Sequence, residues 1–176
     1  MVAKRKRPVR RTKKTILIVG EGSTEKAFLR YVKELYITRD MDISVNVECG
    51  SGGSPRNVVE KAIRLCGSRG YDKCFVLIDA DVPLKTDKKL LSRMKRKPKI
   101  EILKSTPCIE GLFLSVLDNL GNNSSDQCKS IFETTYLASD KKTDKRSYER
   151  LFSREMLNEK RSQVNELNNI LKAMGV

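Results

Sequence analysis

Acidic side chains follow short apolar segments at several points of the chain. Glu21 lies between two glycines just after the apolar run Ile16–Val19, where α/β folds place their ligands. Asp79 and Asp81 stand at the end of another apolar run, and residues i and i+2 of an extended chain point the same way. Because two such carboxylates repel each other unless a cation lies between them, the pattern favours a site for Mg²⁺ or Mn²⁺. The alternative is a solvated pair of acids in a turn.

Two further acids open predicted helices. Glu25 follows Thr24, a candidate N-cap, and lies near the positive end of the helix dipole. Glu110 begins the apolar helix predicted for Ile109–Leu120. Each could be a simple helix-start acid that stabilises its own helix. Glu110 is the stronger candidate for a site residue because, like Glu21 and Asp79, it follows a predicted strand.

The composition excludes several kinds of active site. The chain has no histidine, which rules out a Ser-His-Asp triad, a Cys-His pair and a histidine general base. Its five cysteines form no CxxC pair, and together with the missing histidine this argues against a zinc site. We expect reduced, structural thiols. An enzyme built from this chain would depend on carboxylates, lysines and hard metal ions.

The chain is strongly basic, with a net charge of +14 at pH 7. The segment 1–14 contains no acid and is predicted to be a disordered arm. A second basic segment, 82–99, is predicted to hold a short helix over Asp87–Arg96 that could line a groove beside the acids. Cationic segments suit phosphate backbones, whose binding is independent of sequence and sensitive to salt. The alternatives are a solubilising tail and a solvated helix face. The residues expected to contact nucleic acid are Lys4, Arg5, Lys6, Arg7, Arg10, Arg11, Lys85, Arg93 and Arg96.

Predicted strands and helices alternate through the first 120 residues. Strands are predicted at Ile16–Val19, Ile43–Val47, Lys73–Asp79 and Ile100–Leu103, and helices at Thr24–Tyr36, Pro55–Cys66, Asp87–Arg96 and Ile109–Leu120. This order predicts an α/β fold, an open sheet of about four mainly parallel strands with helices on both faces. Residues 121–176 are predicted to form a helical C-terminal extension packed on the core formed by residues 15–120. The loop Gly50–Gly53 either cradles a phosphate at a helix start or simply connects two elements.

The sequence shows no sign of a membrane or export signal. No apolar run approaches the length of a membrane span, and the N-terminal residues lack the apolar region of a signal peptide. We therefore expect an intracellular, cytoplasmic protein with no membrane partner.

Three acidic motifs occur in a fixed order along the chain. They are EG-x-TE at Glu21–Glu25, D-x-D at Asp79–Asp81, and S-x-P-x-x-E within Ser105–Phe113. A basic N-terminus and the pair Gly52-Gly53 accompany them. Together they resemble the Toprim fold of primases, topoisomerases, recombination proteins and OLD-type nucleases. The closer resemblance is to the RloB-like branch, which is associated with prokaryotic restriction and anti-phage loci.

This resemblance implies a set of site residues. Glu21 would act as a general acid/base or a metal ligand. From their proximity to the acids, and not from the resemblance, Lys104 and Lys26 could stabilise phosphate charge. The implied ligands of a one- or two-metal Mg²⁺ site are Glu21, Glu25, Asp79, Asp81 and Glu110.

The resemblance also implies a function. We expect a Toprim-like, Mg²⁺-dependent nuclease that cleaves DNA or RNA in anti-phage defence, with an ATPase or another defence protein as a candidate partner. Two alternatives stay open: a non-catalytic nucleic-acid-binding or regulatory module, and a metal-dependent phosphoesterase acting on nucleotides.

Overall fold

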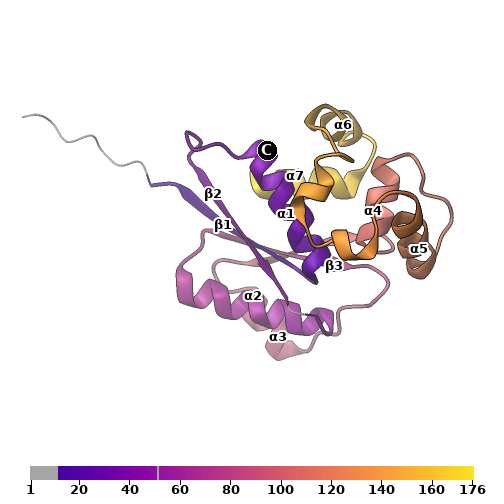
Figure 1. Ribbon diagram of the computed structural model, residues 1–176. Coiled ribbons are helices and arrows are strands. Elements are labelled where there is room, and N and C mark those ends of the chain that lie inside the picture. The colour runs from indigo at the N-terminus through magenta and orange to yellow at the C-terminus, as the bar shows by residue number, and fades with distance from the viewer. Residues whose placement is uncertain (1–11, 51) are drawn as a thin grey trace, which may run out of the picture.

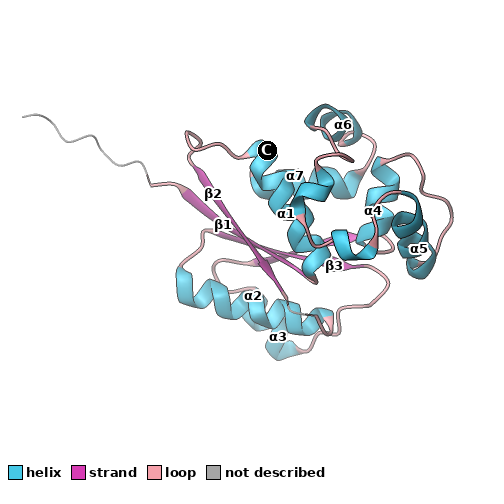
Figure 2. Ribbon diagram, viewed as in Figure 1, coloured by secondary structure: helices cyan, strands magenta, loops and turns pink. Residues whose placement is uncertain are grey.

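A four-stranded, all-parallel sheet forms the centre of the fold (Figure 2). The structure is a computed structural model that describes residues 12–50 and 52–176. The strands are β1 (Lys14–Gly20), β2 (Ile43–Cys49), β3 (Lys73–Asp79) and β4 (Ile100–Ser105), in the order β2-β1-β3-β4. The predicted α/β class with about four mainly parallel strands is confirmed.

Helices cover both faces of this sheet because its two central strands are apolar on both sides. One face packs against α2 (Pro55–Arg69) and α3 (Lys88–Met94), through β1 residues Leu17 and Val19 among others. Figure 1 shows these two helices on one side of the sheet and the remaining helices on the other. The second layer comprises α1 (Ser23–Tyr36), α4 (Ile109–Val116), α5 (Ser125–Thr135), α6 (Arg154–Lys160) and α7 (Asn165–Met174).

The residues after 120 complete the hydrophobic core on the second face. Two short 3₁₀ helices, η1 (Ser139–Lys141) and η2 (Lys145–Tyr148), connect α5 to α6. The Tyr148 ring lies 5.7 Å from the Phe28 ring, and the Phe28 ring lies 4.8 Å from that of Phe113. The C-terminal helices therefore pack back on the sheet, as expected. No helix in the described ranges is long and apolar enough to cross a membrane.

Several predicted boundaries differ from the structure for identifiable reasons. The chain bends at Asp118, whose φ of 55° is left-handed, so α4 ends at Val116 rather than Leu120. The N-cap of α1 is Gly22, and the prediction of Thr24 is wrong because the Glu25 side chain caps this helix instead.

The N-terminal arm is only partly covered by the structure. The strand β1 begins at Lys14, inside the segment predicted as an arm, and Lys13 Nζ donates a hydrogen bond to the Arg39 carbonyl at 2.6 Å. The predicted nucleic-acid contacts Lys4, Arg5, Lys6, Arg7, Arg10 and Arg11 lie outside the described residues.

Candidate active site

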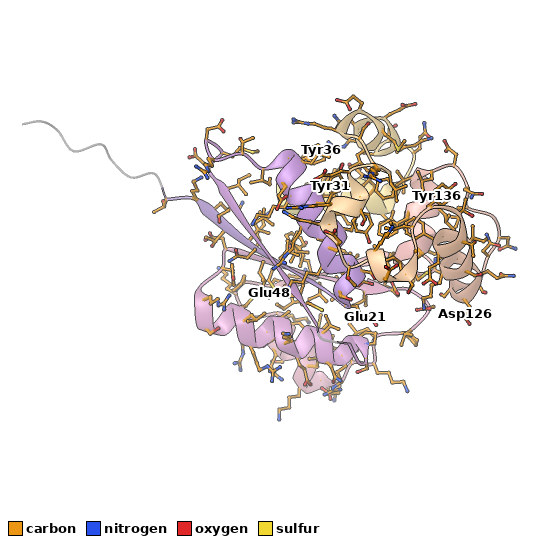
Figure 3. All side chains as sticks on the ribbon, in the orientation of Figure 1. Glu21, Tyr31, Tyr36, Glu48, Asp126 and Tyr136 are labelled. Carbon is orange, nitrogen blue, oxygen red and sulfur yellow. The ribbon has the colours of Figure 1, made fainter. Side chains whose placement is uncertain are left out.

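A pocket of about 330 Å³ lies at the carboxyl edge of the sheet. The ends of β1 and β3 and the starts of α1 and α4 meet there, as the ends of parallel strands do in open α/β sheets. In Figure 3, Glu21 lies just beyond β1, beneath the first turn of α1. The charged residues that line this carboxylate pocket are Glu21, Glu25, Asp79, Glu110, Lys129 and Lys142.

Glu21 is half-buried and is joined to the end of β3. Its Oε2 accepts a hydrogen bond from the Asp79 backbone N–H at 3.3 Å. Burial raises the pKa of Glu21, and the hydrogen bond from Asp79 opposes this shift; the nearby charge of Asp81 raises the pKa further. Glu21 therefore holds a proton more readily than a solvated glutamate does.

Asp79 is the acid that closes β3. Its pKa is raised to about 6, mainly by burial and also by the charges of Glu21, Asp81 and Glu110. A hydrogen bond from Ser105 Oγ to its Oδ1 at 2.8 Å opposes this shift. Ser105 is fully buried at the end of β4, so it fixes the direction of the Asp79 carboxylate.

Asp81 does not join Asp79 in the lining of the pocket. It is exposed, and its backbone N–H donates to the Pro107 carbonyl at 3.1 Å. The expectation that both carboxylates project together assumed an extended chain, but β3 ends at Asp79 and the backbone turns at Ala80. Asp81 still raises the pKa of both Glu21 and Asp79, so it lies within electrostatic range of the pocket.

Glu25 caps its own helix and also lines the pocket. Its Oε2 accepts a hydrogen bond from the Gly22 backbone N–H at 2.8 Å, which caps α1. The side chain also lines the pocket, and the residue is only 5% exposed. Burial raises its pKa to about 7, with a further contribution from the charge of Asp79.

A buried lysine from the connection between η1 and η2 enters the same pocket. Lys142 Nζ lies 2.8 Å from Glu110 Oε1 and 2.6 Å from Glu133 Oε1. Burial lowers the pKa of Lys142, but its hydrogen bonds to Glu110 and Glu133 outweigh this effect and raise it. The buried Tyr148 hydroxyl donates to the Lys142 carbonyl at 2.7 Å and holds the backbone in place. Lys142 is therefore a fixed cation among the carboxylates.

Lys142 was missed by the sequence analysis because no local signal marks it. It is one of 36 lysines and arginines and lies in a polar segment without a motif. Only the packing of η2 against α1, through Tyr148 and Phe28, brings this segment beside Glu110.

A family comparison covers nearly the whole chain. Residues 16–173 match the sequence model of a family described as RloB-like protein. The chain belongs to the RloB-like family. No curated protein and no solved structure gave a match. Membership in this family is consistent with a nuclease-like protein associated with defence.

The predicted phosphate-binding lysines of this RloB-like chain lie outside the carboxylate pocket. Lys104 is exposed and pairs in register with Ile78, whose side chain packs on the face covered by α2 and α3. Neighbours in register point to the same face of a sheet, so Lys104 lies on the opposite face from Asp79. Lys26 Nζ lies 3.9 Å from Glu48 Oε2, near the end of β2. Lys129 and Lys142 take the places at the pocket that Lys104 and Lys26 were expected to have.

The basic segment 82–99 forms the predicted helix, but its arginines do not lie beside the acids. Arg93 and Arg96 line a cleft with Pro98 and Ile100, at the amino end of β4. The carboxylate pocket is at the other end of the sheet. Lys85 is exposed in the connection between β3 and α3. The prediction that this helix lines a groove beside the acids is therefore wrong for Arg93 and Arg96.

The donor set of the RloB-like pocket fits a hard cation. Carboxylate oxygens are the ligands that Mg²⁺ prefers, and Mg²⁺ usually takes one or two carboxylates together with water and substrate phosphates. Within residues 12–50 and 52–176, no three acidic or thiol side chains are close enough to form a metal site by themselves. Burial raises the pKa of both Glu21 and Asp79, and the charge of Glu21 raises that of Asp79 further, so the two carboxylates suit such a site.

Proposed function

We propose that this RloB-like protein is a Mg²⁺-dependent Toprim-type nuclease that hydrolyses phosphodiester bonds of DNA or RNA in cytoplasmic anti-phage defence. The observation that carries this proposal is the carboxylate pocket. Glu21 follows β1, Asp79 ends β3 and Glu110 begins α4, and all three line one space together with Lys142. Their burial and mutual repulsion make the pocket favourable for a cation.

Each residue of the pocket has a role that follows from its contacts. Asp79, oriented by Ser105, and Glu21 would hold Mg²⁺, with Glu25 and Glu110 close by. When bound, Mg²⁺ polarises a phosphodiester and lowers the pKa of an attacking water. The raised pKa of Glu21 suits it to take up or give a proton more readily than a solvated glutamate does. Lys142 and Lys129 present positive charge where a phosphate would lie.

A second candidate function rests on the partners that two of the acids already have. Glu110 is neutralised by Lys142, and Glu25 is engaged by the Gly22 N–H. This arrangement would also suit a non-catalytic module that binds nucleic acid. An ATPase or another defence protein remains a predicted partner in either case.

A cleavage assay separates these functions. The purified protein is incubated with labelled single-stranded DNA, duplex DNA and RNA in the presence of Mg²⁺, Mn²⁺ or EDTA. We expect cleavage with Mg²⁺ or Mn²⁺ and none with EDTA. Asp79→Asn and Glu21→Gln should each lower the rate by about 100-fold or more, the order expected for loss of one electrostatic stabiliser. Asp126→Asn, which removes an exposed acid of α5 outside the pocket lining, should leave the rate unchanged within about twofold.

The other outcomes have definite meanings. Cleavage that survives in Asp79→Asn would show that the assigned site is wrong. Salt-sensitive binding of nucleic acid without cleavage would favour the binding module. Hydrolysis of mononucleotides alone would favour a phosphoesterase.

A further inference from the structure

A second pocket lies within the connection from α5 to α6, outside the carboxylate site. Its volume is about 420 Å³. Residues of η1, of η2 and of the turns beside them form its wall, together with Tyr136 at the end of α5. Its charged lining residues are Lys141, Asp144, Arg146 and Arg150. We call it the basic pocket because three of these four residues are cations.

The cations of the basic pocket differ from their neighbours in the chain. Lys142 is paired with Glu110 and Glu133, and Lys145 is paired with Glu34. In contrast, no ion pair joins Lys141, Arg146 or Arg150 to any residue of the described ranges. Many cations of a chain with this charge must lack an acid partner, but here three of them gather around one hollow.

The one acid of the basic pocket is already engaged. Asp144 is the N-cap of η2, and its Oδ1 accepts a hydrogen bond from the Arg146 backbone N–H at 3.0 Å. It fixes the turn that presents Arg146, and the four charged groups leave the pocket with an excess of positive charge. An anion could therefore enter without displacing an existing ion pair.

The segment that carries these cations is anchored to the core. Tyr148 is fully buried, and its ring lies 5.5 Å from that of Phe113. The Phe152 N–H donates to the Tyr148 carbonyl at 2.9 Å, and Leu137 is buried at the other end of the segment. A pocket held in this way needs little ordering when it binds a ligand, and this preserves affinity.

We infer that the basic pocket binds the phosphate backbone of a nucleic-acid strand whose next portion enters the carboxylate pocket. This inference rests on the proposed function, and it names how the substrate is held. Lys141 lines the basic pocket, while the next residue, Lys142, lines the carboxylate pocket, so one segment forms part of both walls. Arginine guanidinium groups bind phosphates through paired hydrogen bonds. The half-buried Tyr136 also lines this pocket, and its ring adds a surface on which a base could stack.

The test compares two triple variants that remove the same charge. The first is Lys141→Gln, Arg146→Gln, Arg150→Gln. The matched control is Arg30→Gln, Arg64→Gln, Lys172→Gln, which removes three exposed cations from α1, α2 and α7. Binding of a fluorescent 20-nucleotide single strand is measured in EDTA across a series of KCl concentrations. Each phosphate contact contributes about 0.7 to the slope of log K against log salt, so the first variant should lose about 2 from this slope. The control should keep the slope of the wild type.

A charge-conserving variant shows whether weaker binding comes from the lost charge or from a disturbed structure. Arg146→Lys, Arg150→Lys should bind with nearly the salt slope of the wild type. An unchanged slope in the first triple variant would overturn the inference, as would equal loss in the matched control. Competition by polyglutamate as strong as that by unlabelled oligonucleotide would also overturn it, because it would assign the pocket to acidic proteins.

The same proteins separate this inference from the nuclease proposal. If the slope falls as expected but the wild type does not cleave with Mg²⁺, the basic pocket stands and the nuclease assignment fails. If the wild type cleaves and the first triple variant binds and cleaves like the control, the nuclease assignment stands and the basic pocket fails.

Discussion

Lys142 gives the carboxylate pocket its own cation. A buried glutamate such as Glu110, which is 3% exposed, needs a charged or hydrogen-bonded partner, and Lys142 supplies it. The same ammonium group is near the place where a phosphate would bind. The raised pKa of Lys142 means that it stays charged at neutral pH, so it can pair with the Glu110 carboxylate or with a phosphate. Its removal would leave Glu110 buried without a counter-charge as well as weaken any phosphate contact.

Glu25 makes the metal-free protein sensitive to pH. Its pKa in the folded protein is about 7, above the unfolded value of 4.5. The folded state therefore binds the proton more tightly, so this contribution to stability is complete below pH 4.5 and is lost as the pH rises through 7. At about 1.4 kcal/mol for each pKa unit, the loss is about 3 kcal/mol. Glu25→Gln, which keeps an oxygen for the Gly22 N–H, should remove this pH dependence.

Urea unfolding in EDTA at several pH values between 5 and 8.5 measures this effect. The wild type should lose free energy of unfolding across the range, and Glu25→Gln should follow a flatter curve that lies above it at pH 8. The exposed acid variant Asp126→Asn is the control and should follow the wild type. Parallel curves for Glu25→Gln and the wild type would mean that Glu25 is not the titrating group.

The crossing of β1 and α1 depends on the absence of a side chain at Gly20. A Cβ atom at Gly20 would lie 2.7 Å from Glu25 Cβ and 3.3 Å from the Lys26 backbone nitrogen. Neither atom is at the end of a flexible side chain, so Gly20→Ala should push α1 away from the strand. We expect a loss of about 1–3 kcal/mol in the free energy of unfolding, as for other overpacked sites. Because α1 carries Glu25 into the pocket, cleavage should fall as well.

Gly67 provides the matched control for this substitution. It lies in α2, is exposed, and a Cβ atom there would have nothing within 4 Å. Gly67→Ala should therefore stabilise the protein by about 0.5–1 kcal/mol, because alanine favours a helix. Chemical denaturation of the two variants beside the wild type gives both values. A Gly20→Ala protein as stable as the wild type would show that α1 can adjust without cost.

The elements that the sequence predicted best are those with a strong local pattern. The bounds of β3 match the prediction because its five buried residues in a row are apolar and a polar residue stands at each end. The N-cap of α1 was predicted at Thr24, and Glu25 was considered only as a helix-start acid or a ligand. Its hydrogen bond with Gly22, which the sequence does not reveal, shows that it caps the helix. The face occupied by Lys104 depends on the register of β4 with β3, which composition does not reveal. The position of Asp81 was mistaken because alternation applies only as far as the strand continues.

The core of the whole molecule was harder to predict than its sheet. Residues 15–120 were expected to form the core and residues 121–176 to pack on it. In the structure, one hydrophobic cluster contains both Ile18 of β1 and Leu171 of α7. The C-terminal helices also bring Lys142 to the carboxylate pocket, so residues from both parts form the site. Contacts between residues so far apart in sequence leave no periodic signal in either segment.

A shared core predicts that damage to the last helix unfolds the whole chain. Leu171 is fully buried in α7, and Leu171→Ala should lower the free energy of unfolding by about 2–5 kcal/mol. Lys172→Ala, at the next position of the same helix and exposed, should change it by less than about 0.5 kcal/mol. Unfolding is followed by far-UV circular dichroism and by tyrosine fluorescence, which the chain permits because it has five tyrosines and no tryptophan. If residues 15–120 folded independently, Leu171→Ala would split the transition in two and leave the later one at the wild-type midpoint. For a single core we expect one transition, with the same lowered midpoint by circular dichroism and by fluorescence. Cleavage should be lost over the same range of urea, because Lys142 leaves the pocket when that core opens.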